Sequence, residues 1–229
     1  MRRPAMRHIL RAALPILAAA CLPALASAQA VAPVATEAPA GAYEVDLSHA
    51  SLIFRVDHLG LSMYTARFTR FTAALAFDPA RPEASSVTVT VDPNSLQTDF
   101  PTPDKLDFDA MLRGPKWLDA AQFPEMTYRS TRVELTGPNT ARIVGDLTLH
   151  GATHEVVLDA RFNGGYAGHA MEPNARIGFS ARGVLNRSDY GIAYGIPQPG
   201  SKMGVGDEVE VLIEAEFTGP PTPQASPTP

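Results

Sequence analysis

Hydrophobic and polar residues alternate with a period of two along most of this chain. In the stretch DEVEVLIEAEF, from Asp207 to Phe217, every second residue from Val209 onward is apolar, and four glutamates with Leu212 occupy the even-numbered positions. This alternation predicts a strand with one dry face and one wet face. The pattern recurs in SLIFRVDH, SSVTVTVDP and HEVVLDARFNGG, with turn residues between the segments. An antiparallel all-β sandwich or barrel is therefore expected.

One interruption of this period lies in the stretch RFTRFTAALAFDP. Phe68 and Phe71 are three residues apart, whereas strand residues on one face are two apart. A bulge or a sharp twist near Thr69–Arg70 would return both rings to one face. We expect such a break there.

A second interruption, from Thr102 to Pro124, has apolar residues at roughly helical spacing. Thr102 suits a helix cap and Pro103 suits a first helical position, while Gly114–Pro115 would end that helix. A second short helix is expected from 116 to 121. This predicts one helical insertion between strands, placed to cover an open end of a barrel.

The chain's composition suits a single globular domain with extensions at both ends. It has 229 residues, of which 45% are hydrophobic and 19% charged. The basic and then apolar start, closed by Ala-Ser-Ala, is typical of a signal peptide. The expected organisation is a signal peptide at 1–28, an Ala/Pro-rich linker at 29–42, a β-barrel domain at 43–218 and a disordered Pro-rich tail at 219–229.

The predicted signal peptide implies export to the periplasm. Its apolar stretch is too short and too interrupted by proline for a stable membrane span. The chain's one cysteine, Cys21, falls inside that stretch. Lipidation at Cys21 is the alternative, disfavoured because apolar sequence and a good cleavage site follow it.

The charge of the expected mature chain gives no indication of nucleic acid as a partner. Cleavage after Ala28 removes four arginines and no acidic residue, which moves the formal net charge from −5 to −9. No basic patch then remains for nucleic acid or for an anionic membrane surface. The sequence is compatible with a monomer or a homodimer.

Catalytic and metal-binding motifs are weak. GFSAR at Gly178 lacks the second glycine of a nucleophile elbow, and it lies in a strand. His150 and His154 have the spacing of zinc ligands on a helix, but here they flank a turn. We therefore expect no catalytic residue, no metal and no cofactor.

Aromatic residues recur on one parity of many predicted strands, mixed with small residues such as Ala73, Ala160 and Ala181. Rings and small residues together suit a narrow apolar tunnel, and they suit an interdigitated core equally well. The alternation does not decide between these two interiors.

Six segments, from about Tyr43 to Phe217, resemble those of the YceI-like family in order and spacing. They are VDHLG, ARFTRFTAALAFDP, FPEMTYRSTRVE, VGDLTLHGATHEVVLDARFNG, IGFSARGVLNRSDYGI and VGDEVEVLIEAEF. The resemblance implies an extended antiparallel eight-stranded lipocalin-like barrel with a helix between strands. It also implies a tunnel for a long isoprenoid lipid or similar amphiphile.

Combined with the alternation, the resemblance indicates which side chains line that tunnel. These are Phe54, Val56, His58, Phe68, Phe71, Leu75, Met126, Tyr128, Leu147, Leu149, Phe179, Ala181, Val211 and Ile213. Polar groups are expected at its mouth, where a head group would sit. The candidates there are His58, Asn186 and Arg187, although Arg187 is also placed to pair with Asp189 at a turn.

The expected function is binding of a polyisoprenoid or isoprenoid quinone by a periplasmic carrier, store or sensor. Two alternatives stay open at this point. One is a structural or stress-response protein with a filled core, and the other is an enzyme that acts on such a lipid.

Overall fold

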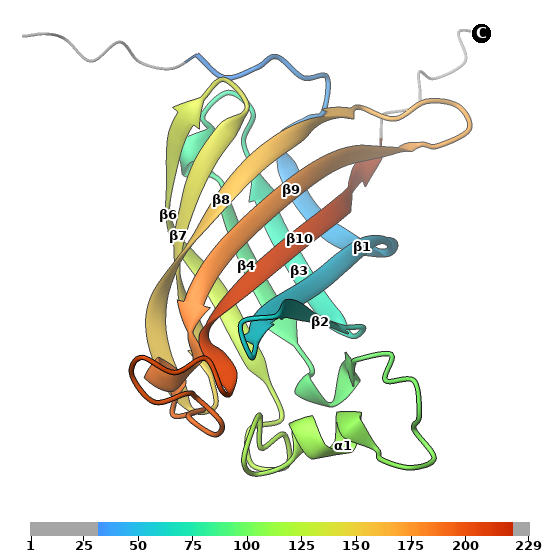
Figure 1. Ribbon diagram of the computed structural model, residues 1–229. Helices are drawn as coiled ribbons and strands as arrows, with labels where there is room; N and C mark the ends of the chain where they lie inside the picture. Colours follow the sequence, from blue (N-terminus) through green and yellow to red (C-terminus); the bar gives the residue numbers. More distant parts are fainter. Residues whose placement is uncertain (1–31, 222–229) are drawn as a thin grey trace, which may run out of the picture. The chain divides into compact units, whose positions relative to one another are not determined.

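The computed structural model describes residues 32–221, which form an antiparallel sheet (Figure 1). The predicted signal peptide and the last eight residues lie outside this range. The strands of the described part are β1 (Gly41–His58), β2 (Ser62–Phe68), β3 (Phe71–Phe77), β4 (Ser86–Val91), β5 (Leu96–Gln97), β6 (Met126–Gly137), β7 (Thr140–Leu149), β8 (Ala152–Tyr166), β9 (Asn174–Asn186) and β10 (Val205–Pro221).

The sheet closes on itself because β1 pairs with β10. The strand order of the closed ring is β10-β9-β8-β7-β6-β4-β3-β1, so eight strands form the barrel. β2 and β5 continue the sheet outside this ring. The predicted eight-stranded antiparallel barrel is thereby confirmed, and the sandwich alternative is wrong.

β1 is long enough to pair with two strands in succession. Its start, Gly41–Glu44, pairs with β3, and its end, Leu52–His58, pairs with β2. The two partner strands are separated at Thr69–Arg70, where the strand breaks off. Phe68 and Phe71 on either side pack into one hydrophobic cluster, as their spacing predicts.

Helical structure between the strands is shorter than the sequence predicts. The described residues contain α1 (Phe108–Arg113) and the 3-10 turns η1 (Pro82–Ala84), η2 (Pro93–Ser95) and η3 (Arg187–Tyr190). No helix among them is both long enough and apolar enough to cross a membrane.

The insertion between β5 and β6 is present, but its expected helix bounds are wrong. α1 begins six residues after Thr102, because the Asp107 carboxylate accepts a hydrogen bond from the Ala110 N–H and caps the helix there. It ends at Gly114 as expected. The second helix, at 116–121, does not form, since Asp119 has a φ of 44° and the chain folds back onto α1.

The barrel strands extend beyond the expected domain limits at both ends. β1 takes in the last residues of the expected linker, and β10 takes in Gly219–Pro221 of the expected tail. Ala38, within the expected linker, is 2% exposed and belongs to a core cluster. The segment 32–40 is therefore packed against the barrel.

Candidate functional site

The barrel interior holds an apolar cavity of about 180 Å³. All eight strands of the closed ring contribute side chains to its wall. The apolar residues of that wall within the strands are Val45, Leu52, Phe71, Ala73, Leu75, Phe77, Val87, Val89, Val133, Leu135, Ala141, Ile143, Leu158, Ala160, Phe162, Phe179, Ala181, Ile213, Ala215 and Phe217. The interior is therefore not completely filled by its own side chains.

Aromatic rings in the wall contact one another without closing the cavity. Phe162 and Phe179 have ring centroids 5.3 Å apart, and Phe77 lies 5.8 Å from Phe162. Phe217 meets Phe179 edge to face at 6.1 Å. Small residues on the same strands, such as Ala160 and Ala181, leave space beside these rings. Packing and an open interior thus coexist in this barrel.

Tyr128 brings a hydroxyl to the wall, but that hydroxyl is already engaged. It lies within hydrogen-bonding distance of the backbone oxygens of Ile143, at 2.9 Å, and Val156, at 3.3 Å. Burial raises the pKa of Tyr128, so the phenol stays neutral. Gly145 makes room for the ring, because a Cβ there would lie 2.5 Å from the Tyr128 Cζ.

Some of the predicted tunnel residues do line the cavity, and others do not. Phe71, Leu75, Tyr128, Phe179, Ala181 and Ile213 line it. Phe68, Met126, Leu147 and Leu149 belong instead to the cluster that fills one end of the barrel. Phe54, Val56 and Val211 lie where β1 pairs with β2 and β10, beyond the cavity wall.

Besides the strand residues, the cavity is lined by residues of the segment 32–40 and of the β3–β4 and β6–β7 turns. The segment passes these two turns at one end of the barrel (Figure 1), and we take this end as the mouth of the cavity. Its rim comprises three parts: Pro33, Val34 and Thr36; Pro79, Pro82, Ser85 and Ser86; and Pro138, Asn139 and Thr140. The Val34 N–H donates to the Pro138 carbonyl at 2.7 Å, which fixes the segment beside the β6–β7 turn. This role could not be predicted, because an Ala/Pro-rich stretch has no strand period.

The predicted head-group residues lie at the other end of the barrel. His58 is exposed at the β1–β2 turn, and Asn186 is exposed at the end of β9. None of His58, Asn186 and Arg187 lines the cavity. That end is filled because Tyr190, Ile192 and Trp117, from the loops, pack onto the inward side chains.

Arg187 is a buried structural residue at this filled end. Its side chain donates to the carbonyl oxygens of Gly206, Ile192, Tyr194 and Val205 at 2.7–2.9 Å. The guanidinium also lies 5.3 Å from the Trp117 ring centroid. Desolvation lowers its pKa, although the charge of Asp207 opposes this. Within residues 32–221 the expected pairing with Asp189 does not form; Arg187 instead binds the 192–206 loop to η3.

Tyr190 carries a buried hydroxyl with no hydrogen-bond partner among the described residues. Its side chain is 2% exposed, and burial raises its pKa to about 12. An unsatisfied buried donor costs about 1–3 kcal/mol. The hydroxyl therefore destabilises the folded state.

We expect Tyr190→Phe to raise the free energy of unfolding by about 1 kcal/mol, because it removes that donor and keeps the ring. Urea denaturation measures the change. Tyr43→Phe is the matched control, since the Tyr43 hydroxyl donates to the Pro39 carbonyl at 2.7 Å and its loss should destabilise. A clear loss of stability in Tyr190→Phe would contradict the assignment.

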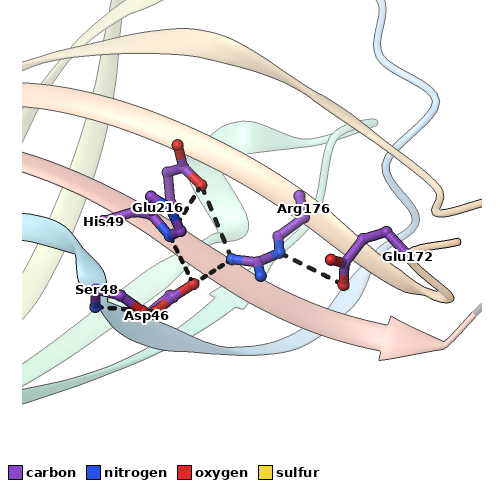
Figure 2. Close-up of polar contacts among 6 residues, drawn as sticks. All are labelled: Asp46, Ser48, His49, Glu172, Arg176 and Glu216. Atoms are coloured by element: carbon purple, nitrogen blue, oxygen red, sulfur yellow. Dashed lines mark hydrogen bonds and ion pairs between the residues drawn. The ribbon is translucent and has the colours of Figure 1, made fainter.

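A polar cluster lies on the outside of the barrel, on a bulge of β1 (Figure 2). Between Val45 and Ala50, β1 advances five residues while β10 advances two, so the chain protrudes. Asp46 in this bulge is ion-paired with Arg176 of β9 and contacts His49 at 3.0 Å. Hydrogen bonds from Ser48, Arg176 and His49 hold the pKa of Asp46 well below its usual range. The cluster attaches the bulge to β9.

His49 should give this bulge a pH dependence. Its hydrogen bond with Asp46, and next the charge of Glu216, raise its pKa above the usual value of about 6.5. The contact therefore stabilises the folded state fully below about pH 6.5 and is lost as the pH rises through the raised pKa. Because the His49 side chain is 58% exposed, this contact has only a small effect on the free energy of unfolding.

An NMR titration of the His49 ring measures this pKa directly. In Asp46→Asn the pKa should fall toward about 6.5, because the first cause of its elevation is gone. An unchanged pKa in that variant would refute the role of Asp46.

The weak motifs do not form a catalytic or metal site in the described part of the chain. Ser180 is on the outside of β9, where it donates to the Glu214 carboxylate at 2.6 Å. His150 bonds the Tyr190 carbonyl, whereas His154 stacks edge-on with the Tyr190 ring. Across residues 32–221 no group of three or more His, Cys, Asp or Glu side chains is placed to hold a metal ion.

Comparisons with known proteins agree with this architecture. A family model described as YceI-like domain matches residues 43–217. A UPF0312 protein from Vibrio cholerae is 37% identical over 189 residues, which are 82% of this chain and 92% of that protein.

Two solved structures share the fold. The YceI protein of Campylobacter jejuni superposes with a TM-score of 0.59 and 28% identity, covering 72% of this chain and 90% of that one. A polyisoprenoid binding domain from Saccharophagus degradans superposes with a TM-score of 0.54 and 15% identity, covering 79% and 99%. At that identity the second match shows the fold alone. The chain belongs to the YceI-like domain family.

Proposed function

We propose that this protein binds the hydrocarbon tail of a long-chain amphiphile, a polyisoprenoid or an isoprenoid quinone, inside the barrel. The observation that carries the proposal is the apolar cavity inside the closed barrel, whose lining reaches the segment 32–40 and the turns beside it. Each methylene moved from water into such a site contributes about 0.8 kcal/mol. A narrow dry cavity therefore binds a tail without needing polar contacts along it.

Family membership supports the same proposal. The structural neighbour from Saccharophagus degradans is described as a polyisoprenoid binding domain. The role we propose is that of a periplasmic carrier, store or sensor, and the periplasmic location rests on the predicted signal peptide in residues 1–28.

We propose binding without catalysis. Tyr128 is the one titratable residue of the cavity wall among residues 32–221, and both of its contacts are to backbone oxygens. Catalysis on a lipid would need titratable groups that converge on the reacting atoms. The outer cluster around Asp46 faces away from the cavity.

Native mass spectrometry of the protein purified from its host, without detergent, tests this function. We expect an added mass that disappears after organic extraction and whose extract contains an isoprenoid lipid. A protein that reproducibly carries only its own mass, and that takes up no isoprenoid when one is added, would contradict the proposal.

A further inference from the structure

The polar groups at the cavity mouth are all uncharged. Thr36, Ser85, Ser86, Asn139 and Thr140 bring hydroxyls and one amide to the rim. Thr36 donates to the Gly165 carbonyl at 3.3 Å, and the Asn139 amide donates to the Phe162 carbonyl at 3.4 Å. Ser86 is exposed and contributes to the rim at the start of β4, where it is paired with Ala76. Because the Thr36 hydroxyl and one Asn139 N–H are engaged, the hydroxyls of Ser85 and Ser86 and the second Asn139 amide N–H are the rim groups that would bond a neutral oxygen-bearing head group.

The charged residues of the rim segments are mostly acidic. Residues 32–40, 78–86 and 136–140 together contain Glu37, Asp78 and Glu83 against one basic residue, Arg81. The Arg81 guanidinium is ion-paired with Asp78 in its own turn at 2.9 Å and is 73% exposed. Of the residues that line the cavity and its rim in the described chain, none is charged.

This distribution of charge should give neutral and anionic head groups different affinities for the rim. A hydroxyl or a quinone carbonyl exchanges water for the rim hydroxyls and amide at little cost. A phosphate drawn to the same place loses hydration with no cation among the lining residues to replace it, and the three rim segments carry a net negative charge. An anionic lipid is thus held by its tail alone, against a repulsive field.

We propose that the site selects isoprenoids with an uncharged head, an alcohol or a quinone, over isoprenoid phosphates and diphosphates. This inference rests on the proposed function, because it concerns the head group of the lipid whose tail fills the cavity. The rim discriminates between head groups, whereas the apolar wall binds any tail of suitable width.

A matched pair of ligands tests the selection. Geranylgeraniol and geranylgeranyl diphosphate have the same tail, and each is titrated against the delipidated protein loaded with the neutral probe N-phenyl-1-naphthylamine. We expect the alcohol to displace the probe at a concentration at least tenfold lower. Equal or tighter binding of the diphosphate would overturn the head-group selection and leave the proposed function intact. Displacement by neither ligand would overturn both.

A lysine placed at the rim provides a second test with a matched control. Ser86→Lys adds a cation at the rim, whereas Thr65→Lys adds the same charge on exposed β2, away from the cavity. We expect Ser86→Lys to tighten binding of the diphosphate about tenfold relative to binding of the alcohol. Thr65→Lys should change neither. Equal effects of the two lysines on the diphosphate would overturn the assignment of the rim.

Discussion

Replacing Ala181 by tryptophan is expected to abolish lipid uptake while the barrel stays folded. Ala181 lines the cavity from β9, directly between Ala160 of β8 and Ile213 of β10, which line it too. An indole at this position would occupy much of a cavity of about 180 Å³. Inserting bulk into a filled core costs about 1–3 kcal/mol, and here existing space should keep the cost near the lower limit.

Bound lipid and stability must be measured separately in this variant. Lipid extraction with mass spectrometry should show at least a hundredfold less isoprenoid than in the wild type, and urea denaturation should show a folded protein. Arg182→Trp is the matched control, since Arg182 is the next residue and is exposed on the outer face. Wild-type lipid content in Ala181→Trp would contradict the position of the cavity.

Replacing Arg187 by alanine is expected to lower the free energy of unfolding by about 3–5 kcal/mol. The change leaves four carbonyl oxygens without their donor and removes the contact with Trp117. Arg187→Lys should recover only part of this loss, because an ammonium does not reproduce the geometry of the guanidinium fork. The 192–206 loop should become mobile in both variants.

Arg182→Ala is the control for this prediction, because its side chain is exposed and its loss should change stability by less than about 0.5 kcal/mol. Hydrogen exchange at Ile192 and Val205 locates the effect. An Arg187→Ala protein that loses less than about 1 kcal/mol would show that these carbonyls find other partners.

The strands could be predicted from sequence because period-two alternation is a local property. The break at Thr69–Arg70 followed from two phenylalanines alone, and the structure confirms it. Barrel closure did not follow from alternation, since the β1–β10 pairing joins opposite ends of the domain. Closure of the sheet into a barrel could be predicted only from the resemblance to a family.

The position of the cavity could be predicted only in part. The parity of a residue determines whether its side chain points into the barrel, but it does not determine how far along the barrel axis that side chain lies. Phe71 and Leu149 both point inward, yet Phe71 reaches the cavity while Leu149 lies in the filled end. The position along the axis depends on strand register and on which loops fold over each end. No local pattern indicates that Tyr190 and Ile192 pack into one end.

The partners of Arg187 were equally hidden in the sequence. A nearby carboxylate, Asp189, is visible in the chain, whereas backbone carbonyls carry no sequence signal at all. Similarly, Val34 and Thr36 lie in an Ala/Pro-rich stretch whose composition resembles that of linkers. Contacts made through backbone atoms could be identified only from the three-dimensional structure.

A crystal structure of the protein purified from its host, without detergent or delipidation, tests the central claim most directly. We predict continuous elongated electron density inside the barrel, from Phe71 at the inner end to Ser86 at the rim. A cavity that holds only ordered water, or that side chains have closed, would contradict the account.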